Sequence, residues 1–114
     1  MLTVDVLRDY GANVDEGLGR CFNNESFYLK LVGMSLVDPS FERLTRAVEA
    51  QNAVEAFEAC HALKGSLGNL ALTPIYEPVC ALTEQLRGAS ELGDVSALYS
   101  QIMDAAAALR KLAE

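Results

Sequence analysis

The residues best suited to chemistry in this sequence surround its only histidine, His61, in the stretch CHALKGSLGNL at positions 60–70. On a helix of about 3.6 residues per turn, Lys64, Gly65 and Gly68 lie on the same side as this histidine. A neutral imidazole is nucleophilic at one ring nitrogen, and a lysine three residues away can bring its ammonium to an anion carried by that ring. Glycine costs about 1 kcal/mol relative to alanine inside a helix. The two glycines therefore predict a bare ledge that the backbone of another protein can approach.

A purely structural explanation of the same residues is the alternative. A lone exposed histidine on a helix is usually without a function, and helical glycines often serve only close helix packing. The core face of this segment is supplied by apolar residues, which are Ala53, Ala56, Cys60, Leu63, Leu67 and Leu70. His61 lies about 130° from the middle of that face, at the edge of the solvent side. The combination of His61, Lys64 and two glycines on a face that the core does not need favours a functional site.

Helix-capping residues and breaks predict the elements that position this face. Four residues precede helical runs as N-caps, and they are Thr3, Asn13, Asn24 and Asp94. The pair Asp38-Pro39 either starts a new helix or kinks one long helix that ends near residue 50. Pro78 is expected to bend the first turns of its helix. The long helical segments are predicted at about 24–50, 53–70, 73–87 and 94–112.

Apolar spacing predicts which sides of these helices face a common core. Residues at intervals of three and four share one face of the segment after Asn24, namely Phe27, Leu31, Met34 and Val37. A similar stripe runs along the last helix through Val95, Leu98, Ile102, Leu109 and Leu112. No stretch shows the alternation typical of strands. We therefore expect an all-α fold, an antiparallel four-helix bundle in up-down-up-down order with one or two short accessory helices at the N-terminus.

Length and composition narrow the class of protein. The 114 residues fit a single domain with a bundle core at about 24–113, and 51 % hydrophobic residues exclude general disorder. A net charge of −7 argues against a nucleic acid or an anionic membrane as partner. The start of the chain lacks signal-peptide features, and no apolar run is long enough to span a bilayer. The three cysteines, Cys21, Cys60 and Cys80, are expected to be buried thiols of a reducing compartment, so we expect a cytoplasmic protein. The net charge favours a monomer.

Two kinds of catalytic site are poorly supported. A metal or cofactor bundle needs several ligands, but the chain has one histidine and no Glu-x-x-His pair. Cys60 and His61 are adjacent in a helix, so their side chains point about 100° apart and do not form a hydrolase pair. We therefore expect neither a metal nor a bound cofactor.

The stretch HALKGSLGNL resembles the signature of the histidine-containing phosphotransfer (HPt) domain family, which reads H-x-[LI]-K-G followed by small residues and a leucine. The likeness extends over about residues 13–112. It implies a four-helix bundle with accessory helices that carries phosphoryl groups between aspartates of receiver domains. By this resemblance His61 is phosphorylated on its outer ring nitrogen, Lys64 neutralises the phosphoryl oxygens and Gly65 leaves room for the receiver. Gly68 matches the small residues that follow.

The resemblance also implies partners. These are response-regulator receiver domains or a hybrid histidine kinase, and any Mg²⁺ belongs to the receiver. Val54 and Phe57 flank His61 and are candidate docking contacts, although Phe57 is equally suited to packing at the edge of the core. Many family members carry Gln or Glu on the next helix within reach of the histidine. Thr83 stands at that place here, beside Glu84 and Gln85, so no hydrogen-bond partner from that helix is predicted.

Three functional interpretations follow from the sequence. The first is a stand-alone phosphorelay intermediate, and the second is a bundle that docks partners without phosphotransfer. The third is the phosphorylatable N-terminal module of a chemotaxis-type kinase. The 114 residues leave no room for a catalytic domain that binds ATP, and no mixed sheet is predicted, so the chain is not expected to be an enzyme. Ala71 stands where the family commonly has glycine. The conformation of the turn that follows the histidine helix is therefore not predicted.

Overall fold

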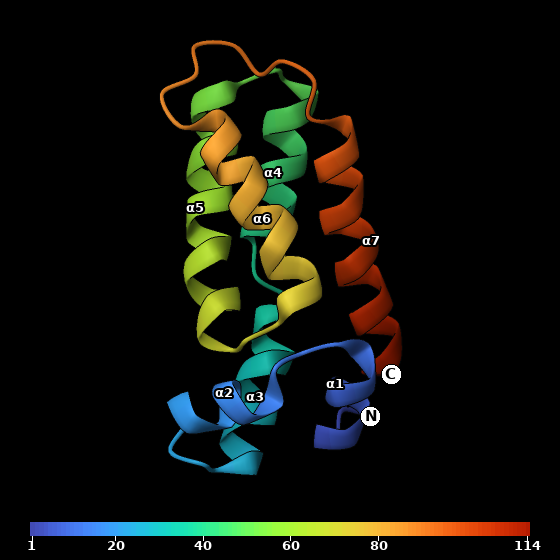
Figure 1. The fold of residues 1–114 in the computed structure, drawn as a ribbon. Helices are drawn as coiled ribbons and strands as arrows, with labels where there is room; N and C mark the ends of the chain where they lie inside the picture. Colours follow the sequence, from blue (N-terminus) through green and yellow to red (C-terminus); the bar gives the residue numbers. More distant parts are fainter.

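A computed structural model describes all 114 residues and contains seven α-helices and no strand (Figure 1). The short helices at the N-terminus are α1 (Val4–Tyr10) and α2 (Val14–Arg20). They are followed by α3 (Glu25–Ser35), α4 (Ser40–Glu49), α5 (Ala53–Asn69), α6 (Thr73–Leu86) and α7 (Ser96–Leu112). The predicted all-α fold is confirmed.

Helices α4 to α7 form the antiparallel bundle, with each helix packed against the next one in the chain (Figure 1). The connection from α4 to α5 and that from α5 to α6 are tight turns, which favours antiparallel neighbours. The bundle closes between α4 and α7. There Thr45 and Tyr99 share a hydrogen bond of 2.7 Å between their hydroxyls, and the Arg110 guanidinium lies 4.9 Å from the ring centre of Phe41.

The predicted caps at the N-terminus are confirmed. The side chains of Thr3, Asn13 and Asn24 each accept a hydrogen bond from a backbone N–H in the first turn of α1, α2 and α3. At residues 38–39 the structure has a new helix rather than a kink. α3 ends at Ser35, and the Asp38 carboxylate accepts a 2.8 Å hydrogen bond from the Ser40 N–H as α4 begins.

The three N-terminal helices gather at one end of the bundle, where α2 and α3 lie at the C-terminal end of α5 and α1 lies beside the end of α7 (Figure 1). The last carbonyls of a helix have no partner inside it. Here the Tyr28 hydroxyl donates a 2.9 Å hydrogen bond to the Leu70 carbonyl, and the Asn13 N–H donates one of 3.0 Å to the Ala71 carbonyl. The Arg20 guanidinium donates to the Gly68 carbonyl. The accessory helices therefore hold the end of the helix that carries His61.

The predicted core face of α3 is wrong. Phe27, Met34 and Val37 are exposed, and the buried residues of this segment are Tyr28, Val32, Ser35 and Leu36. This helix is apolar on more than one side, so spacing alone did not distinguish the sides. The hydrogen bond of Tyr28 to the end of α5 selects the observed one. At the C-terminus Leu112 is also exposed, because it lies in the last turn of α7.

Two further expectations concern α6 and the cysteines. The helix runs without interruption from Thr73 to Leu86, with Pro78 buried inside it. Cys21 and Cys60 are buried thiols as predicted, whereas Cys80 is only partly buried. None of the helices combines the length and the apolar character that a membrane span requires.

Candidate functional site

His61 is the central residue of α5, and its side chain is exposed. The helix is fixed at its start by Asn52, whose side chain accepts a 3.1 Å hydrogen bond from the Glu55 N–H. The opposite side of α5 is buried by the predicted core residues, Ala53, Ala56, Cys60, Leu63, Leu67 and Leu70. Helical spacing therefore placed the histidine correctly, on the side of α5 that faces away from the core.

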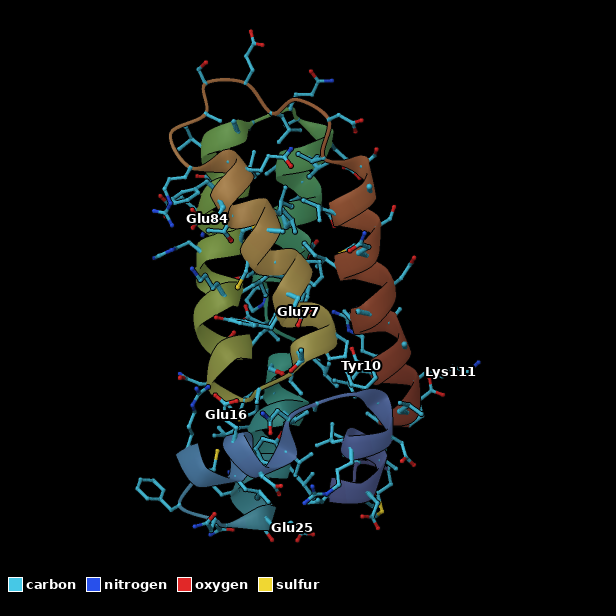
Figure 2. The ribbon with its side chains drawn as sticks, viewed as in Figure 1. Tyr10, Glu16, Glu25, Glu77, Glu84 and Lys111 are labelled. Atoms are coloured by element: carbon cyan, nitrogen blue, oxygen red, sulfur yellow. The ribbon has the colours of Figure 1, made fainter.

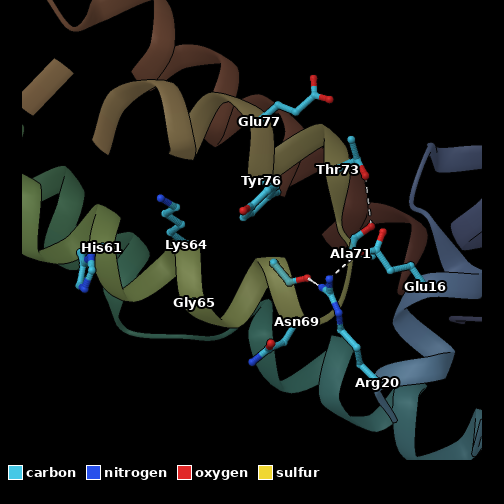
Figure 3. A pocket seen from close by; sticks show the side chains of 11 residues that line it. Glu16, Arg20, His61, Lys64, Gly65, Asn69, Ala71, Thr73, Tyr76 and Glu77 are labelled. Atoms are coloured by element: carbon cyan, nitrogen blue, oxygen red, sulfur yellow. Dashed lines mark hydrogen bonds and ion pairs between the residues drawn. The ribbon is translucent and has the colours of Figure 1, made fainter. Parts of the chain in front are cut away.

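An open groove of about 730 Å³ extends from His61 toward the N-terminal helices (Figure 3). Its floor is α5 at Gly65 and Gly68, and its walls come from α2 and α6. The other residues that line it are Glu16, Arg20, Lys64, Asn69, Ala71, Thr73, Tyr76 and Glu77. Nothing in the sequence indicated that α2 and the start of α6 would meet at this place.

The two glycines beside His61 have different surroundings. A Cβ atom built on Gly65 meets nothing within 4 Å, so this part of the helix is open to a partner. A Cβ atom on Gly68 would lie 2.8 Å from Cε1 of Tyr76 on α6. The absence of a side chain at Gly68 is therefore needed for packing between α5 and α6. No packing contact within the fold requires glycine at position 65.

Lys64 is half-buried, and its side chain extends toward α6 rather than across to the imidazole (Figure 3). On α6, Glu84 pairs with Arg87 at 2.9 Å. The Arg87 guanidinium holds the pKa of the Glu84 carboxyl below its usual range, and the Lys64 ammonium adds to the effect. The Glu84 carboxylate is thus stabilised mainly by Arg87 and to a smaller extent by Lys64. Figure 2 shows Glu84 on the bundle portion of α6.

Phe57 forms a direct contact with His61 from one turn earlier on α5. The two rings are stacked, with centroids 5.8 Å apart and an angle of 20° between their planes. The guanidinium carbon of Arg87 lies 5.4 Å from the centre of the same phenylalanine ring. Sequence reasoning missed Arg87. The available indication was its place at the C-terminal cap of α6, but that does not reveal the neighbour on α5.

The residues considered on the helix next to His61 are mostly engaged elsewhere. Thr83 is fully buried, and its hydroxyl donates a 2.7 Å hydrogen bond to the Val79 carbonyl. The Gln85 amide donates a 3.0 Å bond to the Asp94 carbonyl.

Val54 is 64 % exposed, two turns before His61 on the same helix. It is therefore available to a partner.

The arrangement combines an exposed histidine, open helix surface at Gly65 and a half-buried lysine one turn further along the same helix. No group of three or more His, Cys, Asp or Glu residues is placed to hold a metal ion. In comparisons with known proteins, the family model described as Hpt domain matches residues 36–112, which is more than half of the chain. Neither the curated proteins nor the solved structures gave a match.

Proposed function

Because this chain belongs to the Hpt domain family, whose members carry out histidine phosphotransfer in two-component signalling, we propose that it is a phosphorelay intermediate. In this role His61 accepts a phosphoryl group from the aspartate of one receiver domain and passes it to another. The observation that carries the proposal is the exposed histidine of the H-A-L-K-G motif at the centre of α5, beside open helix surface at Gly65.

The transfer is an in-line displacement at phosphorus. The unprotonated outer nitrogen of the His61 imidazole attacks the aspartyl phosphate, so an N–P bond forms while the O–P bond to the aspartate breaks. The aspartate leaves as a carboxylate, and the proton on the inner ring nitrogen stays there during the step. Transfer to the next receiver is the same reaction in reverse. Positioning of the two groups supplies most of the acceleration, and a Mg²⁺ ion held by the receiver would supply further charge stabilisation on the receiver's side.

Lys64 stabilises the phosphoryl group once it reaches the ring. Its ammonium lies one turn from His61 on the same helix, and its flexible stem can turn from α6 to a new anion. Gly65 admits the receiver because no side chain occupies the space next to it.

The partner that fits this surface is a receiver domain with apolar residues around its phospho-aspartate. Val54 offers apolar contact at one end of the His61 face, and the groove at Gly68 lies at the other end. A transient contact of this kind needs only a small buried area. We propose that the domain acts as a monomer in the cytoplasm, where free buried thiols such as Cys60 stay reduced.

The proposal is tested by mass measurement of the intact protein after incubation with phosphorylated receivers. We expect one phosphoryl adduct on the wild type that is lost in acid and stable in base, and no adduct on His61→Ala. Absence of an adduct with every receiver of a panel would contradict phosphotransfer and favour a bundle that only docks its partners. An adduct that persists on His61→Ala would place the acceptor elsewhere.

A further inference from the structure

The His61 ring is not free on its helix, because an aromatic residue holds one of its faces. Phe57 stacks on it with a centroid distance of 5.8 Å and nearly parallel planes. An exposed side chain on a helix ordinarily exchanges between staggered rotamers. Stacking with an aromatic neighbour favours the one rotamer in which the two rings overlap. The contact therefore limits the directions in which the ring nitrogens can point.

Phe57 is in turn held from the neighbouring helix. Arg87, at the end of α6, places its guanidinium carbon 5.4 Å from the centre of the phenylalanine ring. This distance is within the range of a cation–π contact. The guanidinium is also tied to its own helix, because its Nη2 donates a 2.9 Å hydrogen bond to the Glu84 carboxylate. A continuous set of contacts thus joins α6 to the imidazole through Phe57.

We propose that Phe57 and Arg87 are positioning residues for phosphotransfer, which hold the His61 imidazole in the orientation that presents its outer nitrogen to the receiver. The proposal rests on the phosphorelay function given above and adds two residues to it. Neither residue touches the phosphoryl group, and Arg87 acts only through Phe57. A ring that is already oriented loses less freedom when the receiver arrives, so the transfer step is faster.

A positioning role differs measurably from a docking role for the same phenylalanine. A docking contact strengthens the receiver complex, so its loss raises the receiver concentration needed for half-maximal rate. A positioning contact acts after the complex has formed, so its loss lowers the rate at saturating receiver. The orientation of the imidazole also exists in the free protein, where the ring current of Phe57 shifts the proton resonances of the His61 ring.

The experiment compares Phe57→Leu, Phe57→Tyr and Arg87→Gln with the wild type. Leucine keeps apolar bulk without a ring, and tyrosine restores the ring. The matched control is Arg46→Gln, which breaks the exposed Arg46–Glu42 pair on α4 but removes no contact with Phe57. The readouts are the His61 ring-proton shifts in the free protein and the transfer rate from a phosphorylated receiver at saturation. Thermal unfolding of each variant verifies that it is folded.

We expect the Phe57-dependent shift to vanish in Phe57→Leu, to return in Phe57→Tyr and to shrink in Arg87→Gln. The saturating rate should fall about three- to tenfold in Phe57→Leu, which matches the energy of one aromatic pair. Arg87→Gln should show a smaller fall, and Arg46→Gln should behave as the wild type. Unchanged ring shifts, or a loss of receiver affinity at an unchanged saturating rate, would overturn the positioning role. A wild type that never becomes phosphorylated would instead overturn the proposed function itself, and the positioning role with it.

Discussion

At the scale of single residues, the two glycines that follow His61 separate access from packing. Gly65 is exposed with open space beside it, whereas the α-carbon of Gly68 faces the ring of Tyr76. Packing against Tyr76 thus accounts for the glycine at 68, whereas the proposed approach of a receiver domain accounts for the glycine at 65. This difference can be measured with one methyl group at each site.

Gly65→Ala should stabilise the fold and impair its function. Alanine gains up to about 1 kcal/mol over glycine in an open helix position, which corresponds to a rise of about 4 °C in Tm. The new methyl group stands where the proposed receiver approaches, so transfer to His61 should slow. Gly68→Ala should lack the gain in stability, because its methyl group displaces Tyr76. Thermal unfolding measures both, and an equal stabilisation of the two variants would contradict the assigned difference.

Lys64→Gln should slow phosphotransfer about tenfold, because the proposed charged hydrogen bond to the phosphoryl oxygens cannot form. Lys64→Arg should keep most of the rate. Lys111→Gln, in the last turn of α7, is the control for the loss of one positive charge far from the site (Figure 2). The rates are read from the appearance of the intact-mass adduct. A Lys64→Gln protein as fast as the Lys111→Gln protein would remove Lys64 from the mechanism.

The sequence was sufficient to predict the placement of His61, Lys64 and Gly65 on one exposed helix side, because these residues are close in the chain. Arg87 and Tyr76 could not be predicted in this way. They reach the site from α6, and their positions depend on how α5 and α6 are rotated against each other. Helical periodicity determines angles within one helix but not this rotation.

At the scale of elements, α2 and α3 serve as a cap on the helix that carries the histidine. Their contacts go to consecutive parts of the turn after α5, including the bond from Tyr28 to the Leu70 carbonyl. That turn needs support, because Ala71 adopts a left-handed backbone with φ of +55°. This is the position at which the sequence departs from the family's glycine, and the structure shows the conformation that glycine would adopt more easily.

Gly17→Ala tests how closely α2 is seated. A Cβ atom there would lie 2.6 Å from Cε1 of Tyr28 and 2.8 Å from the Leu70 carbonyl oxygen. We expect a loss of about 1–3 kcal/mol in the free energy of unfolding, as for overpacking elsewhere. Gly19→Ala on the same helix is the matched control, because nothing lies within 4 Å of its new methyl group. Equal free energies of unfolding in urea for the two variants would contradict the close packing of α2 against Tyr28 and the Leu70 carbonyl.

The capping residues and helix bounds were largely predictable, since they depend on local sequence such as Asn24 and its hydrogen bond to the first turn of α3. The buried side of α3 was not. Phe27 and Met34 are as apolar as the buried Val32, so burial there depends on which side packs against the rest of the fold. The apolar spacing of α3 did not distinguish its sides, and contacts with the other helices determine which side is buried.

At the scale of the whole molecule, buried acidic groups limit the stability of the fold at high pH. Burial raises the pKa of Tyr10, Tyr28 and Cys60 to about 12. The folded state therefore favours the neutral forms of these groups more than the unfolded state does. Their contribution is fully present below the ordinary pKa values of tyrosine and cysteine. It is lost as the pH rises to about 12.

We accordingly expect the urea midpoint to fall between pH 9 and pH 12. Tyr28→Phe removes one of the titrating groups, so its stability should depend less on pH in that range, by about 1–2 kcal/mol. It should also be less stable than the wild type at pH 8, because the hydrogen bond to the Leu70 carbonyl is lost. If the urea midpoint of Tyr28→Phe fell as steeply between pH 9 and pH 12 as that of the wild type, the burial of this hydroxyl would be contradicted.

The central claim is that phosphoryl groups pass through His61 from one receiver to another. The most direct measurement mixes a purified phosphorylated receiver with a second, unphosphorylated receiver of different mass and follows both by intact mass. With the wild-type chain we expect the phosphoryl group to appear first on the chain and then on the second receiver. With His61→Ala the second receiver should gain no more than it gains without the chain. Equal transfer to the second receiver with wild type and His61→Ala would contradict the relay.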